Sequence, residues 1–278
     1  MSVLLFTVIL LIGAYLAGLL GSLTGLGGGV VIIPLLTLFF GVDIRYAIGA
    51  ALVASIATSS GSASAYVKEG ITNIRLGMFL EIATTSGAVV GAILAMYTPT
   101  NLVAILFGVV LIFSAAMTLR KKADHLDITN ADRFAKRLKL NGTYPTENRE
   151  VAYTVRHVPA GYAIMSIAGI LSGLLGIGSG ALKVLAMDTA MHTPFRVSTT
   201  TSNFMIGVTA AASAVVYLQR GYIDPGIAFP VVLGVLAGAF TGSKVLTQMN
   251  VKYLKIIFSI VIVLLALEMM YNGFTGKF

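Results

Sequence analysis

A lysine and a glutamate lie in stretches of the chain that are otherwise apolar. Lys183 falls in the first turn of a short apolar run that follows Gly176-Ile-Gly-Ser-Gly180. A positive charge there opposes the helix dipole, and an intramembrane lysine costs on the order of 3 kcal/mol on insertion scales. Asp188, about 140° around the helix, is a poor partner. We therefore predict that Lys183 contacts a bound anion; snorkelling or pairing with an acid elsewhere in the chain is the alternative.

Glu81 lies inside the apolar run 76–97. It is about six residues from the start of that run, which is roughly 9 Å along a helix. A carboxylate at this depth is a candidate for proton coupling, or for pairing with Lys183. A glutamate that only reaches a wet vestibule is the other interpretation.

Two glycine-rich breaks could expose helix N-termini inside the membrane. The first is Gly25-Leu-Gly-Gly-Gly29 and the second ends at Gly180. Unpaired N–H groups and the helix dipole make such an N-terminus attractive to anions. The alternative is that the glycines only allow close packing, which we favour for the G-x-x-x-G pairs Gly87/Gly91 and Gly238/Gly242. The predicted substrate-binding residues of the breaks are Gly27, Gly28, Gly29, Gly178, Ser179 and Gly180.

Hydroxyl side chains are concentrated in two of the long apolar runs. Ser55, Thr58 and Ser62 recur at helical spacing and so share one face, and the second run opens with Thr199-Thr-Thr-Ser-Asn203. Small polar residues also hold transmembrane helices together, so packing is the default for most of them. The residues that we nevertheless assign to the substrate site are Ser55, Thr58, Thr201, Ser202 and Asn203.

The composition places these residues in a membrane protein. The 278 residues are 57% hydrophobic and 11% charged, with a mean hydropathy of +0.91, whereas soluble domains are about 25% charged. The same values exclude intrinsic disorder. The chain has no cysteine, which excludes a disulfide scaffold and thiolate metal sites, and its three histidines are too scattered to suggest a metal site. We expect no cofactor.

The apolar runs predict an all-α polytopic fold. Eight runs approach the length of about 20 residues that a spanning helix needs; the runs at 29–40 and 180–191 are too short and suggest broken or re-entrant hairpins. The eight longer runs are 3–22, 46–67, 76–97, 101–119, 159–176, 197–218, 226–246 and 252–271.

The chain is internally duplicated. A shift of 151 residues places Gly18 on Gly169, Gly29 on Gly180, and Arg45 on Arg196. Each half changes sides of the membrane an odd number of times, so we predict two inverted-topology repeats, residues 1–119 and 158–278. Such repeats are a feature of many secondary transporters, which bind their substrate at the repeat interface.

Residues 120–157 form a polar linker between the repeats. Nine of the 19 Lys and Arg residues lie between Arg120 and Arg156, which predicts a cytoplasmic location under the positive-inside rule. No folded basic domain accompanies them, so nucleic acid is not an expected partner. Within the linker, Phe134 and Leu138 lie one turn apart among basic residues. This pattern suits a short amphipathic helix on the anionic leaflet, and a solvated linker is the alternative.

The motifs resemble those of the sulfite exporter TauE/SafE family. The resemblance rests on Gly21-x3-Gly-x-Gly-Gly-Gly29 followed by Pro34, on Gly49-Ala-Ala-Leu52, and on Gly70-Ile-Thr-Asn-Ile-Arg75, with a second-half counterpart at Thr201-Ser-Asn-Phe-Met-Ile-Gly207. It implies a multipass permease that moves sulfite, sulfonates or related small anions across a prokaryotic plasma membrane. Two positions depart from the pattern, Ser179 in the second break and Leu185 where the first half has Pro34.

Together these features predict a secondary transporter for small anions. The resemblance implies that these are sulfite, organosulfonates or related small organic anions, and that they are exported. Transport would proceed by alternating access, with Glu81 as the candidate for proton coupling. A passive anion channel on the same scaffold is the alternative. An enzyme is not expected, because no nucleophile–base pair or metal set is visible. The expected partners are the small anion and the lipid bilayer; the sequence does not give the oligomeric state.

Overall fold

Helices make up nearly all of the regular structure in the computed structural model, which describes residues 3–24, 28–119, 132–146, 149–245 and 251–278. Seven helices of the described part are long and apolar enough to cross a membrane, which confirms the all-α polytopic fold. They are α1 (Val3–Thr24), α3 (Ile44–Lys68), α4 (Ile74–Tyr97), α5 (Thr100–Leu119), α7 (Val158–Leu175), α9 (Phe195–Gln219) and α10 (Pro225–Val245).

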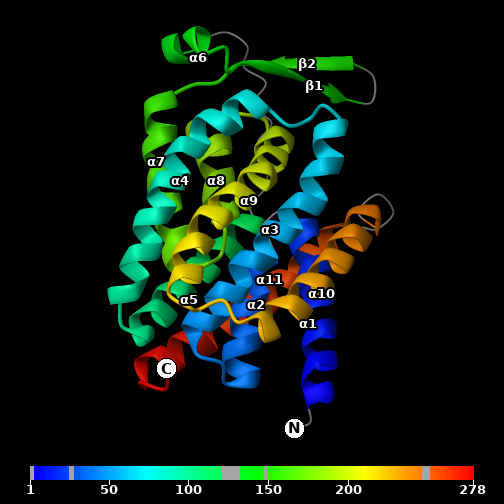
Figure 1. Cartoon of the computed structure of the whole chain (residues 1–278). Helices are drawn as coiled ribbons and strands as arrows, with labels where there is room; N and C mark the ends of the chain where they lie inside the picture. The colour runs from blue at the N-terminus through cyan, green and yellow to red at the C-terminus, as the bar shows by residue number, and fades with distance from the viewer. Residues whose placement is uncertain (1–2, 25–27, 120–131, 147–148, 246–250) are drawn as a thin grey trace.

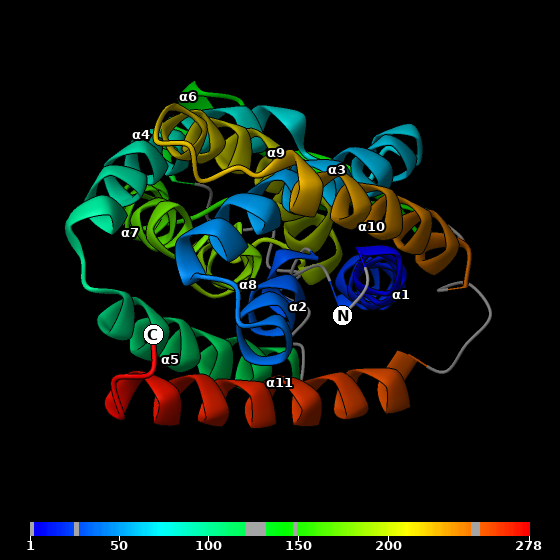
Figure 2. The same cartoon turned by 60° about the horizontal axis from the view of Figure 1, so that its bottom comes forward.

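The eighth expected span corresponds to α11 (Val251–Phe274), a 24-residue helix. Its residues Ser259–Phe274 form an apolar stretch. Helix α11 packs along α5, and Figure 2 shows the two helices side by side along one side of the bundle.

Two short helices follow the glycine-rich breaks. Helix α2 (Gly29–Pro34) continues into the π-helical segment η1 (Leu35–Phe39), and α8 (Gly180–Leu185) continues into η2 (Ala186–Ala190). Each continuous run is therefore about 16 Å long at 1.5 Å per residue, roughly half the thickness of a bilayer core. As the sequence predicts, each run is too short to cross a membrane.

The order of elements in the second half repeats that of the first. Helices α8, α9, α10 and α11 each begin 151 residues after α2, α3, α4 and α5 respectively, and η2 does so after η1. The packing is paired in the same way: α1 packs on α10 as its counterpart α7 packs on α4, and α3 packs on α9. Helix α1 begins at the end of the molecule where the N-terminus lies, whereas α7 begins at the opposite end, beneath the strands (Figure 1).

Glycines allow the paired helices to approach closely. A side chain at Gly87 or Gly91 would collide with the backbone of α7, and one at Gly238 would collide with the Tyr15 carbonyl of α1. These contacts confirm the packing role predicted for Gly87, Gly91 and Gly238, since only a residue without a Cβ permits such an approach.

The stretch between the halves folds onto one end of the bundle. We call residues 132–146 and 149–157 the cap. The cap contains α6 (Arg133–Arg137) and an antiparallel hairpin of β1 (Gly142–Thr146) and β2 (Arg149–Tyr153), in which Gly142 lies opposite Tyr153. The hairpin was not predicted from the sequence.

The cap shares a hydrophobic core with the bundle. Ala135, Leu140 and Tyr144 are buried against a cluster that includes Leu76 of α4 and Val197 of α9. This packing makes the described part of the stretch a folded cap rather than a solvated linker, and the amphipathic helix expected around Phe134 is present as α6.

Candidate substrate and proton site

Lys183 is completely buried. It lies in α8, three residues after the helix begins at Gly180, and its side chain has no exposed surface. The Nζ atom donates a hydrogen bond to Thr209 Oγ1 of α9, at 2.5 Å. The break before α8 thus directs a cation into the centre of the bundle, where α8 packs against α9.

The acid that faces this cation is Glu81. Its Oε2 atom lies 3.9 Å from Lys183 Nζ. Its Oε1 atom accepts hydrogen bonds from the hydroxyl of Thr209, at 2.5 Å, and from that of Thr85, at 2.9 Å. Oε2 accepts no hydrogen bond from any residue in the described ranges. One carboxylate oxygen is therefore fully engaged and the other faces the lysine with a free lone pair.

Three helices bring the three groups together. Asn73 caps α4 by accepting a hydrogen bond from the Leu76 N–H, and the helix that starts there carries Glu81 two turns into the bundle. Helix α9 supplies Thr209, which accepts from Lys183 and donates to Glu81. The result is a continuous chain of amine, hydroxyl and carboxylate, which we call the Lys183–Thr209–Glu81 chain.

The sequence left the partner of Lys183 open between a bound anion and an acid, and the structure supplies the acid. Thr209 was missing from the predicted site. Its position carried a usable signal, because it belongs to the hydroxyl-rich face of 197–218 and is the counterpart of Thr58 at the 151-residue offset. The rotation of α9 about its own axis, which directs Thr209 toward Lys183, cannot be read from the sequence.

The first half has no equivalent charges. The counterparts of Lys183, Thr209 and Glu81 at the 151-residue offset are Ile32, Thr58 and Val232. Ile32 is buried, and the hydroxyl of Thr58 donates to the carbonyl of Ala54 in its own helix. The Lys183–Thr209–Glu81 chain therefore has no charged counterpart at the positions of the first half that correspond to it.

The two glycine-rich breaks lie next to one another. A side chain at Gly29 would collide with the Ser55 hydroxyl and approach the Gly176 carbonyl, and one at Gly28 would approach the hydroxyl of Thr58. Of the residues predicted for the first break, Gly27 lies outside the described residues. The structure thus brings Gly28, Gly29, Ser55 and Thr58 together beside the second break.

The second break has a left-handed backbone. Gly178 and Ser179 have φ angles of +66° and +48°, a region that costs a residue with a Cβ roughly 1–2 kcal/mol. The hydroxyl of Ser179 is buried and unpaired within the described part of the chain, and the Gly180 carbonyl accepts a hydrogen bond from Ser202. Ser179 therefore departs from the glycine pattern at a position where glycine would be relaxed.

The remaining predicted residues divide into two groups. Thr201 accepts a hydrogen bond from the backbone N–H of Asn73, so it joins α9 to the start of α4. Asn203 is buried; its carbonyl accepts from Ser59, and its side-chain Nδ2 has no partner in the part of the chain that is described. The hydroxyl of Ser55 is also buried and unpaired there.

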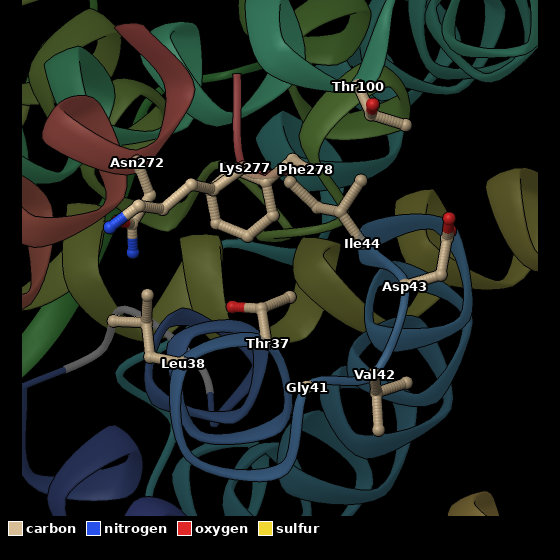
Figure 3. Close-up of a pocket in the computed structure, with 10 residues that line it drawn as sticks. All are labelled: Thr37, Leu38, Gly41, Val42, Asp43, Ile44, Thr100, Asn272, Lys277 and Phe278. Carbon is tan, nitrogen blue, oxygen red and sulfur yellow. The ribbon is translucent and has the colours of Figure 1, made fainter. Parts of the chain in front are cut away.

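An open concavity lies at the end of the molecule opposite the cap. Its volume is about 420 Å³, and it is lined by Thr37, Asp43, Thr100, Asn272 and Lys277, among others. Figure 3 shows these side chains around the loop that follows η1 and the C-terminal residues. The concavity shares no residue with the Lys183–Thr209–Glu81 chain, which lies closed within the bundle.

The arrangement is that of a membrane protein with a charged centre between broken helices, and comparison with known families agrees with it. A model of the family described as sulfite exporter TauE/SafE matches residues 10–269. The chain belongs to the sulfite exporter TauE/SafE family. No solved structure matches the chain.

Curated relatives of this TauE/SafE chain carry transporter names. The chain is 30% identical over 273 residues to a protein of Bacillus subtilis strain 168 named probable membrane transporter protein YunE, covering 96% of this chain and 98% of that protein. It is 28% identical to a second protein of that strain, probable membrane transporter protein YdhB, covering 83% and 86% of the two chains. A protein of Methanocaldococcus jannaschii, probable membrane transporter protein MJ0441, is 25% identical, covering 96% of each chain.

These findings confirm the resemblance to the family and identify the chain as a multipass membrane transporter. The family and the names of its relatives indicate transport rather than catalysis. No group of three or more potential metal ligands occurs in the described part of the chain.

Proposed function

We propose that this TauE/SafE protein exports sulfite, organosulfonates or related small organic anions across the plasma membrane by alternating access. The observation that carries the proposal is the buried Lys183–Thr209–Glu81 chain. A fully buried lysine must have a counter-charge. Glu81 supplies one such counter-charge, and a small anion can take its place.

The two counter-charges exclude one another. An anion and an ionised Glu81 beside a single Lys183 would leave one negative charge uncompensated in a low-dielectric region, which is strongly unfavourable. The anion therefore binds when Glu81 takes up a proton, and Glu81 releases that proton when the anion leaves. Its Oε2 atom, which lacks a hydrogen-bond partner among the described residues, is available for the proton.

This exchange couples one proton to one anion in the same direction. A monovalent anion then moves without net charge, and an accumulated anion runs out of the cell down its own gradient. The same coupling makes an imposed pH gradient drive anions toward the alkaline side.

The glycine-rich breaks supply the remaining ligands in this proposal. The N-terminal N–H groups of the short helices after Gly28 and Ser179 carry partial positive charge. Three buried polar groups without a partner in the described ranges, on Ser55, Ser179 and Asn203, offer hydrogen bonds to anion oxygens. Such groups cost free energy when left unpaired, so an oxyanion that engages them is favoured.

Alternating access rests on the proposed inverted repeat of residues 1–119 and 158–278. The paired packing of α1 with α10 and of α4 with α7 supports it, as do the opposite ends at which α1 and α7 begin (Figure 1). Inverted repeats allow the halves to exchange conformations around a fixed site. The basic residues of the cap support a cytoplasmic position for that end of the molecule.

Flux through reconstituted vesicles tests the function. The purified protein is placed in liposomes loaded with methanesulfonate, whose charge does not change between pH 5 and 9, and efflux is followed with and without a pH gradient. The proposal requires a rate that saturates with concentration and a flux directed toward the alkaline compartment. A non-saturating anion current that ignores the pH gradient would instead identify a passive channel.

A further inference from the structure

The outer face of α6 combines apolar and basic side chains. Phe134 is 52% exposed, and Leu138, the residue that follows the last turn of α6, is 42% exposed. Four basic residues surround them, Arg133, Lys136, Arg137 and Lys139, all of them exposed. The opposite side of α6 carries Ala135, which is buried against the bundle.

Two hydrogen bonds fix the height of this face relative to the spanning helices. The carboxylate of Asp132 accepts a hydrogen bond from the N–H of Val158, the first residue of α7, at 3.0 Å. At the other end of the segment, the Leu140 carbonyl accepts from the side chain of Asn73, the residue that caps α4, at 2.8 Å. The segment 132–140 is therefore held at the level where two spanning helices begin.

Because spanning helices begin near the surface of the hydrocarbon core, we place this level at the boundary between membrane and water. Figure 1 shows α6 lying across the end of the bundle, beside the start of α7. Exposed aromatic and aliphatic side chains at this depth bury their apolar atoms among lipid headgroups, and basic side chains beside them attract anionic lipids. The one acidic residue of the segment, Asp132, is occupied with the N–H groups of Phe134 and Val158.

We propose that the outer face of α6 is a docking surface for anionic phospholipid headgroups. Phe134 and Leu138 enter the headgroup region, and the four basic residues contact the lipid phosphates. The cap is thereby attached to the leaflet as well as to the bundle. Only the assignment to the cytoplasmic leaflet rests on the proposed orientation; the surface itself does not depend on transport or on the identity of the substrate.

The composition of the chain makes the test direct. The protein contains no tryptophan and no cysteine, so a single substitution introduces a unique probe. The Phe134→Trp variant of the full chain is placed in nanodiscs of phosphatidylcholine with or without about one third phosphatidylglycerol, and quenching by brominated acyl chains is measured. The matched control is Thr143→Trp, because Thr143 is exposed on β1 next to the buried Tyr144 and so faces away from the bundle.

The proposal predicts blue-shifted, quenchable emission from position 134 that increases severalfold with phosphatidylglycerol. Position 143 should give red-shifted emission that brominated lipid does not quench. Adding Lys136→Gln and Arg137→Gln to the Phe134→Trp variant should abolish the dependence on anionic lipid. Emission from position 134 that matches position 143 in both lipids would overturn the proposal, as would quenching that does not change with lipid charge.

A nitroxide probe provides a second route. Leu138→Cys labelled with a spin probe should be accessible to oxygen and protected from a water-soluble nickel reagent when phosphatidylglycerol is present. Equal exposure to the nickel reagent at positions 138 and 143 would place α6 in water and contradict the proposal.

Discussion

The Nζ atom of Lys183 lies 3.9 Å from Glu81 Oε2, and the hydroxyl of Thr209 links the amine to the other carboxylate oxygen. This relationship changes what substitutions of the lysine should do. From the sequence alone, Lys183→Met would keep or raise stability, because it removes a buried charge. With Glu81 facing it, the same change leaves an uncompensated carboxylate.

We therefore expect Lys183→Met to destabilise the protein at pH 8. Removing one partner of a buried ion pair costs about 3–5 kcal/mol of unfolding free energy. The double variant Lys183→Met/Glu81→Gln should recover most of the unfolding temperature, and Ile32→Met, at the equivalent apolar position, is the control. Thermal unfolding followed by circular dichroism checks this, and a single variant as stable as the parent at pH 8 would show that the pair contributes nothing.

The bridging hydroxyl gives a second prediction. Thr209→Val keeps the shape of the side chain but removes the hydrogen bond of Lys183 Nζ, and it leaves Glu81 Oε1 with only the hydrogen bond from Thr85. The expected loss is about 1–3 kcal/mol of unfolding free energy. Thr58→Val at the equivalent position should lose less, since that hydroxyl only bonds a carbonyl in its own helix. Equal losses in the two variants would argue against a special role for Thr209.

Glu81→Gln should separate binding from coupling. The glutamine amide is neutral, so it does not compete with the anion for Lys183, and anion binding should persist. Because the amide cannot take up and release a proton, the response of flux to a pH gradient should disappear. Glu69→Gln, an exposed acid beyond the end of α3, is the control and should behave like the parent in reconstituted flux. Continued pH-driven flux in Glu81→Gln would remove Glu81 from the coupling mechanism.

The stability of the cap should depend on pH through Tyr153. Burial raises the pKa of Tyr153 from 10.0 to about 12, against the opposing effect of its hydrogen bond with Asn73. Because the folded protein holds this proton more tightly than the unfolded chain, the contribution of Tyr153 to stability is complete below pH 10.0 and is lost as pH rises toward about 12. In an alkaline absorbance titration at about 295 nm, the Tyr153→Phe variant should therefore lose a tyrosine component that titrates at about pH 12 in the parent. An unchanged titration curve would contradict this placement of Tyr153.

The sequence predicted the parts of the site that follow from local pattern. The glycine breaks could be placed because glycine interrupts an apolar run, and Lys183 and Glu81 stood out because a charge in such a run is costly. Their pairing could not be derived, since it depends on how α4, α8 and α9 rotate against one another. Thr201 was assigned to the site from its place in a hydroxyl-rich run, and the hydrogen bond that it accepts from the N–H of Asn73 could not be derived from residue spacing.

The cap was harder to predict than the bundle. The pattern of Phe134 and Leu138 among basic residues indicated α6, whereas the hairpin of β1 and β2 has only five residues in each strand. Its strands are stabilised by packing Tyr144 and Tyr153 against α4 and α9. Tertiary contacts of this kind override weak local preferences.

In the proposed mechanism a substrate anion and the ionised Glu81 compete for Lys183, and the pH dependence of anion affinity tests this competition most directly. Binding of methanesulfonate to the purified protein is measured by calorimetry between pH 5 and 9. As the pH rises through this range, the parent should lose affinity, by up to about tenfold per pH unit, as one coupled proton requires. Glu81→Gln should bind with constant affinity, and Lys183→Met should bind roughly 10- to 150-fold more weakly than the parent at low pH, the loss of a charge-assisted hydrogen bond. Equal, pH-independent affinity in all three proteins would contradict the account.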